Sequence, residues 1–132
     1  MLRARTSPGA ERTARAARTA LGIVRIVNGA LGLLAPQVLV RRLSDQTGGQ
    51  TAAAVYGLRL FGVRTVLIGA DLLRLRGAEL DRAVARGVLI HASDTATAAA
   101  LLRAGRVPPP IVAISALNTA LAVTAYVAGR RR

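Results

Sequence analysis

The sequence predicts an all-α protein, a four-helix transmembrane bundle with an Arg-rich N-terminal segment. Three observations indicate this fold class. Apolar residues make up 52% of the 132 residues and glycine adds 13 more, which exceeds the usual share in a soluble domain. The apolar residues gather in runs of about the twenty residues that a helix needs to cross a bilayer. Arginines stand mainly at the ends of these runs, where membrane topology places basic residues.

A chain of this length forms one domain rather than two. We expect residues 1–18 to be a basic cytoplasmic segment and residues 19–129 to be the transmembrane domain. Residues 130–132 form a basic tail.

The first helix is expected over about 19–36. A signal peptide also combines a basic start with an apolar run, but Arg25 and Asn28 lie inside this run and no small-x-small cleavage site follows. We therefore favour an uncleaved helix and keep the signal peptide as the alternative. Pro36 ends or kinks this helix, and residues 38–43 are expected to lie as a short amphipathic turn at the interface.

A loop at 44–50 leads to the second helix, expected over about 51–75. Its interior holds Arg59 and Arg64, and Asp71 lies near its far end. A central arginine costs about 2.5–3.5 kcal/mol on insertion, and each Leu, Ile, Val or Phe returns only about 0.3–0.6. This helix is therefore marginal without partners.

The third helix is expected over about 78–104 and is the weakest span, because Asp94 offsets its few large apolar residues. Either it does not cross the membrane, or Asp94 faces a partner inside the bundle. Three prolines then precede the fourth helix, expected over about 110–128. Residues 111–128 carry no charge and are the strongest spanning signal.

The distribution of arginines predicts the orientation. Twelve of them flank one set of helix ends, in the N-terminal segment, the 74–86 link and the tail, and four flank the other set. The positive-inside rule then places both termini in the cytoplasm of a multi-pass protein of the bacterial inner membrane.

Four polar residues fall near mid-membrane if the helices alternate in direction: Asn28, Arg64, Asp94 and Asn118. We predict that they form a buried polar layer in which Arg64 pairs with Asp94, because an unpaired charge at this depth is too costly. Four further ionisable residues are secondary candidates: Arg25, Arg59, Asp71 and His91.

Two interpretations of this layer stay open. In the first, Arg64, His91 and Asp94 line a pocket or a proton path, since His91 and Asp94 are three apart and share a helix face. In the second, the layer supplies interhelical hydrogen bonds that set the packing register.

Small residues four apart also favour close helix packing, although they arise easily by chance in an Ala-rich chain. These sets are Ala53 with Gly57, Ala92 with Ala96 and Ala100, and Ala116 with Ala120.

Several function classes are disfavoured. The chain has no Cys and one His, so thiol chemistry, disulfides and Cys-based metal sites are excluded. No nucleophile triad, metal cluster or pair of catalytic carboxylates can be assembled. We expect no cofactor and no metal, and an enzyme is not favoured.

A net charge of +13 would suit a nucleic-acid binder. Stacking on single strands needs aromatic platforms, however, and the chain has only Tyr56, Phe61 and Tyr126. Its basic residues also flank apolar runs instead of forming one solvated face. No nucleic-acid partner is expected.

The element Arg59-Leu60-Phe61-Gly62-Val63-Arg64, followed by Gly69, resembles a pattern of small uncharacterised four-helix bacterial membrane proteins of the broad DoxX-like type. The likeness in helix layout covers residues 19–128. It implies a compact four-helix membrane bundle and carries no settled activity. The long Arg-rich start and the polar third helix depart from the simplest form of the pattern.

The leading functional hypothesis is a small accessory or binding subunit in the inner membrane, surrounded by lipid and acting as a homo-oligomer or with a membrane-complex partner. An alternative is a small proton-coupled transporter that uses Arg64, Asp94 and His91. A membrane-bound redox helper is implied by the family likeness alone.

Overall fold

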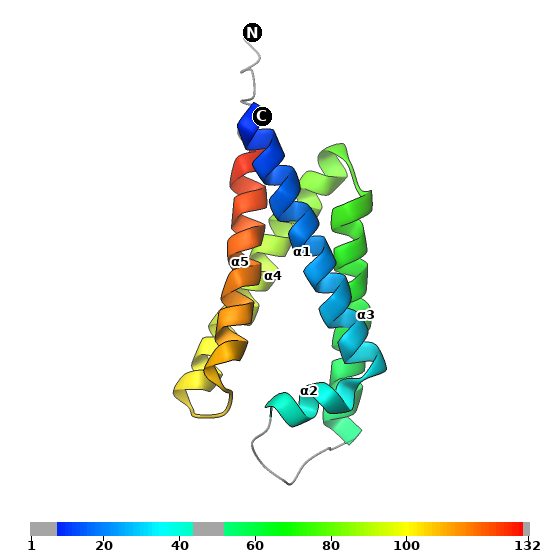
Figure 1. Ribbon diagram of the computed structural model, residues 1–132, viewed down its shortest axis with the longest axis vertical. Coiled ribbons are helices and arrows are strands. Elements are labelled where there is room, and N and C mark those ends of the chain that lie inside the picture. Colours follow the sequence, from blue (N-terminus) through cyan, green and yellow to red (C-terminus); the bar gives the residue numbers. More distant parts are fainter. Residues whose placement is uncertain (1–7, 44–51, 131–132) are drawn as a thin grey trace.

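The computed structural model describes residues 8–43 and 52–130, and these residues form an all-α structure without strands (Figure 1). The helices are α1 (Pro8–Leu34), α2 (Pro36–Leu43), α3 (Ala52–Arg74), α4 (Gly77–Arg103) and α5 (Pro109–Arg130). The four long helices pack into a bundle, and the short α2 contacts α1 and α3 at one end of it. The expected loop at 44–50 lies outside the described residues, as do residues 1–7 and 131–132 of the basic segments.

The bounds of α3, α4 and α5 agree with the expected ones to within two residues, but α1 begins at Pro8 rather than near residue 19. The helix continues back through the basic segment because Ala and Arg are strong helix formers. Glu11 lies in its first turn, where a carboxylate complements the helix dipole. The expected turn at 38–43 is the helix α2, which starts at Pro36.

Three helices, α1, α3 and α5, are long and apolar enough to cross a membrane. α4 is as long as α1, at 27 residues, but it is not among them. Its charged residues, Asp94 among them, explain the difference. The structure therefore supports three of the four expected crossings by length and composition.

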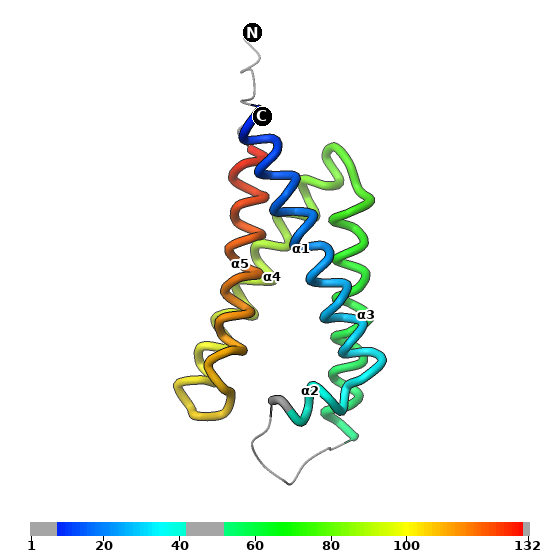
Figure 2. Tube along the Cα trace, viewed as in Figure 1, coloured from blue at the N-terminus to red at the C-terminus, as the bar shows by residue number. Residues whose placement is uncertain are grey.

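The packing order around the bundle is α3, α1, α5 and α4, and the consecutive helices α3 and α4 contact each other much less than the other neighbours do. The start of α1, the end of α5 and the α3–α4 turn share one end of the bundle, which we call the terminal end (Figure 1). At the opposite end, α1 and α3 separate from α4 and α5 (Figure 2).

The hydrophobic core lies towards the terminal end, where all four long helices contribute. Its buried members are Ala17, Leu21, Leu72, Leu80, Val84, Ala122 and Ala125.

Glycines bring α1 and α3 into backbone contact. A Cβ atom on Gly29 would lie 2.7 Å from the carbonyl oxygen of Gly62, and one on Gly62 would lie 2.6 Å from the carbonyl oxygen of Gly29. Likewise, a Cβ atom on Gly69 would lie 2.7 Å from the carbonyl oxygen of Gly22. The two antiparallel helices therefore approach too closely for any side chain at these positions.

The small-residue pairs proposed from the sequence do not make such contacts. A Cβ atom on Gly57 would have no neighbouring atom within 4 Å. The alanines of these pairs are all exposed: Ala53, Ala92, Ala96, Ala100, Ala116 and Ala120. The packing glycines are seven apart rather than four apart, which is why the four-residue pattern missed them.

The outer surfaces of α1, α3 and α5 carry many large apolar side chains. Exposed large side chains recur at helical spacing on α1, α3 and α5. They include Ile23, Val27 and Leu31 of α1, Leu60, Val63 and Leu67 of α3, and Ile114, Leu117, Val123 and Val127 of α5. The bundle thus presents to its surroundings the residues that a water-soluble protein buries.

We expect Gly62→Ala to lower the free energy of unfolding by about 1–3 kcal/mol, because the added methyl group meets the backbone of α1 and forces the helices apart. Gly57→Ala on the same helix is the matched control, and helix propensity predicts that it stabilises by up to about 1 kcal/mol. Unfolding in detergent followed by circular dichroism measures both. Equal effects of the two substitutions would contradict the close contact.

Candidate polar site within the helical bundle

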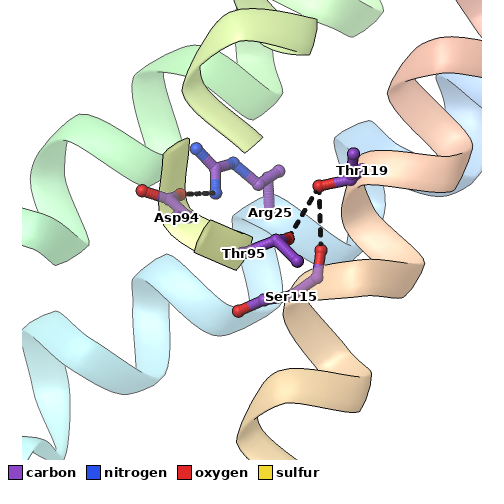
Figure 3. Close-up of polar contacts among 5 residues, drawn as sticks. All are labelled: Arg25, Asp94, Thr95, Ser115 and Thr119. Atoms are coloured by element: carbon purple, nitrogen blue, oxygen red, sulfur yellow. Dashed lines mark hydrogen bonds and ion pairs between the residues drawn. The ribbon is translucent and has the colours of Figure 1, made fainter. Parts of the chain in front are cut away.

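Arg25 of α1 and Asp94 of α4 form an ion pair across the bundle (Figure 3). The Arg25 Nη1 atom lies 3.9 Å from Asp94 Oδ2, which is longer than a charge-assisted hydrogen bond. The Arg25 side chain is only 4% exposed, whereas that of Asp94 is 45% exposed. The guanidinium is therefore enclosed by the helices, and the carboxylate lies at the edge of the site.

The ion pair predicted between Arg64 and Asp94 is not the one that forms. Arg64 is exposed on α3, one residue before the buried Thr65. One residue corresponds to a turn of about 100° around a helix, and Arg64 lines the groove between α3 and α4 instead of the bundle interior. The prediction matched residues by depth along the helices and did not consider this rotation.

Arg25 was only a secondary candidate, yet its spacing from the packing glycines of α1 places it on an interior face of the helix. It lies three residues after Gly22 and four before Gly29, on the face of α1 that packs against α3. A Cβ atom on Gly69 would lie 3.1 Å from the Cβ atom of Arg25. The glycines that face α3 therefore turn Arg25 inward as well.

His91 and Asn118 are buried next to this pair. His91 lies three residues before Asp94 on α4 and is 1% exposed, and Asn118 of α5 is 7% exposed. Within this group, three side-chain atoms find no hydrogen-bond partner among the described residues: Arg25 Nε, His91 Nε2 and Asn118 Oδ1. Such buried polar atoms are rare in folded proteins and usually bind water or a ligand.

A hydroxyl chain joins α4 to α5 beside the site (Figure 3). The Oγ1 atoms of Thr95 and Thr119 are 2.8 Å apart, and the Thr119 hydroxyl donates to the Ser115 carbonyl oxygen at 3.2 Å. A hydroxyl has one hydrogen, so Thr95 donates to Thr119. This contact brings Asp94 and Asn118, the residues preceding these threonines, to the same level. Neither threonine was a candidate from the sequence.

The remaining candidates lie outside the buried site. Asn28 is half-buried on α1, and Arg59 and Asp71 are exposed on α3. Of the predicted layer, Asp94 and Asn118 therefore lie at the same level, and Asp94 pairs with Arg25 instead of Arg64. No three His, Asp or Glu residues within 8–43 and 52–130 are grouped so that they could hold a metal ion.

A groove of about 1010 Å³ runs between α3 and α4, where these helices make few contacts. Five charged residues line it: Arg64, Asp71, Glu79, Arg82 and Arg86. Its lining reaches Ile90, the residue before His91. The groove thus extends along α4 to the turn that carries the polar site.

We expect Asp94→Leu to lower the free energy of unfolding by about 3–5 kcal/mol, because it leaves the enclosed Arg25 charge without a partner inside the bundle. The double variant Arg25→Leu, Asp94→Leu should recover most of this loss. Arg64→Leu is the control and should change stability by no more than about 0.5 kcal/mol, as exposed substitutions usually do. Unfolding in detergent measures the stability of each variant, and a larger loss for Arg64→Leu than for Asp94→Leu would overturn the assignment.

Comparison of the chain with protein-family models, with curated proteins and with solved structures finds no match. Any functional assignment therefore depends on the residues of this chain and their geometry.

Proposed function

We propose that the chain is a multi-pass protein of the bacterial inner membrane that binds a small polar molecule inside its helical bundle, as an accessory or binding subunit. The observation that carries this proposal is the inverted distribution of polarity. Apolar side chains cover the outside of the bundle, while Arg25, His91 and Asn118 are buried within it. Lipid is the solvent in which this arrangement is favourable.

The path of the chain supports four crossings. The α3–α4 turn lies at the terminal end, and the α4–α5 connection lies at the opposite end (Figure 1). If α3 and α5 cross the membrane, α4 must return across it between them. The ion pair with Arg25 offsets the cost of placing Asp94 of α4 at that depth.

The arginines support a cytoplasmic location of both termini. Among the residues that the structure describes, eight arginines belong to segments at the terminal end and four belong to segments at the opposite end. This is the asymmetry that the positive-inside rule associates with the cytoplasm.

The buried site favours a small, neutral ligand. Arg25 and Asp94 carry opposite charges, so the pair adds no net charge to the site. The unpartnered atoms comprise a donor, Arg25 Nε, an acceptor, Asn118 Oδ1, and His91 Nε2, which donates or accepts according to its tautomer. A neutral molecule that both accepts and donates hydrogen bonds suits these atoms, whereas an ion would leave an uncompensated charge in a medium of low dielectric constant.

The natural absence of cysteine allows the topology to be measured with single-cysteine variants. Ala78 and Ala104 are exposed and lie at the two ends of α4. We expect Ala104→Cys to react with a membrane-impermeant maleimide in intact spheroplasts, and Ala78→Cys to react only after permeabilisation. Reaction of both from the same side would show that α4 does not cross, and the reversed pattern would show the opposite orientation.

Acetamide, which carries one amide donor group and one acceptor, probes the ligand class. At ten times its Kd, single-site binding would stabilise the protein by about 1.4 kcal/mol, and this gain should be lost in Asn118→Leu. Comparing the two proteins at the same acetamide concentration cancels the general effect of the solvent on unfolding. Equal responses of the wild type and the variant would count against a binding site at Asn118.

A small proton-coupled transporter is a second candidate, favoured by the charged groove that reaches the turn of His91. It differs from a binding subunit in one measurable respect. In proteoliposomes with an imposed pH gradient, a transporter moves protons above the level of empty vesicles, and Asp94→Asn abolishes this flux without loss of folded protein. If the wild type moves protons no faster than empty vesicles do, the transporter role is excluded and only the binding role remains.

A further inference from the structure

A second cavity, of about 500 Å³, lies at the terminal end where α1, α4 and α5 meet. We call it the terminal cavity. Three arginines from three helices line it, namely Arg18, Arg82 and Arg130. It is separate from the buried polar site, because none of the residues of that site lines it.

The charges of the terminal cavity are unbalanced. Asp81 is the one carboxylate among its lining residues, which include both Arg82 and Arg130. Neither Arg82 nor Arg130 is within ion-pair distance of a carboxylate among the described residues. The cavity therefore carries an excess of positive charge that complements an anion.

Tyr126 holds one of these arginines in place. The Arg130 guanidinium carbon lies 4.9 Å from the centre of the Tyr126 ring, a distance at which a cation and an aromatic face attract each other. Tyr126 also lines the cavity, together with Leu80, Val84 and Ala125. The wall thus combines fixed cationic donors with an apolar surface.

The level of the cavity in the bundle identifies the source of the anion. Arg130 ends α5, whose 22 residues extend about 33 Å at 1.5 Å per residue. The hydrocarbon core is about 30 Å thick, so Arg130 lies at the level of the lipid headgroups. Exposed Val123 and Val127 of the same helix lie just below, at the level where acyl chains begin.

We propose that the terminal cavity binds the phosphate of an anionic phospholipid from the cytoplasmic leaflet, with Arg82 and Arg130 donating hydrogen bonds to its oxygens. Guanidinium groups suit this role because they donate two parallel hydrogen bonds to a phosphate. Basic pockets between membrane helices on the cytoplasmic side commonly bind such headgroups. This inference rests on the proposed membrane location and orientation, but it does not depend on a ligand at the buried site.

The full-length protein, reconstituted in phosphatidylcholine vesicles with or without phosphatidylglycerol and extracted in mild detergent, allows retained lipid to be counted by native mass spectrometry. We expect one phosphatidylglycerol per chain. Retention should weaken by about fivefold for each arginine removed, since one basic residue near the membrane surface contributes about 1 kcal/mol. Arg130→Gln assigns the effect to this cavity, because Arg82 also lines the α3–α4 groove and Arg130 does not.

Arg76→Gln is the matched control, since Arg76 is exposed at the same end and lines neither cavity. An equal loss of lipid in Arg76→Gln and Arg130→Gln would show diffuse attraction and overturn the proposal. The variant Arg130→Lys keeps the charge, and partial retention by it supports the site even if Arg130→Gln fails to fold.

Three further outcomes show which proposal fails. Displacement of the lipid by millimolar glycerol phosphate would identify a soluble phosphate ester as the ligand and overturn the assignment to lipid. A protein that inserts into the vesicles, resists alkaline extraction and retains no phosphatidylglycerol would refute this inference alone. A protein that fails to insert would refute the proposed membrane location.

Discussion

The contact between the backbones of α1 and α3 is the constraint on which the rest of the structure depends. Gly22 and Gly29 of α1 face Gly69 and Gly62 of α3, and no side chain fits between them. Because this contact fixes how α1 is rotated about its axis, it also decides that Arg25 faces the interior. α1 also packs against α5. The same rotation therefore decides which face of α1 meets α5.

The burial of the interior polar side chains and their choice of partners follow from this packing. Arg25 is enclosed and reaches Asp94 on a helix with which α1 has no extensive contact. A charge placed in lipid without a partner costs several kcal/mol, so the ion pair couples the position of α4 to that of α1. The Thr95–Thr119 contact then ties α4 to α5. Polar side chains thus link the helices where apolar packing is thin.

The two ends of the bundle differ in construction. At the terminal end the four long helices share an apolar core that includes Leu21, Leu72 and Leu80. At the other end the helix pairs separate, and the short α2 lies next to α1 and α3 (Figure 1). Packing is rigid where the core is dense. The polar site lies between these two regions.

Local sequence was sufficient to predict the helical class, the bounds of α3, α4 and α5, and the presence of apolar helices long enough to cross a membrane. These properties follow from local composition, from the prolines and glycines that end helices, and from the length of apolar runs. The sequence also predicted that α4 is weak as a membrane span and that Asp94 and Asn118 are polar residues within apolar helices. These properties depend on single residues within one helix.

Which residues meet, in contrast, depended on how the helices pack. Depth along the helices predicted Arg64 as the partner of Asp94, but the rotation of each helix selected Arg25, and that rotation is set by contacts between helices. The start of α1 was also missed, because basic residues were interpreted as a separate segment although they are compatible with a helix. Glycines seven apart on two antiparallel helices gain their meaning only once the helices are paired, since neither set distinguishes an interface from an exposed face on its own.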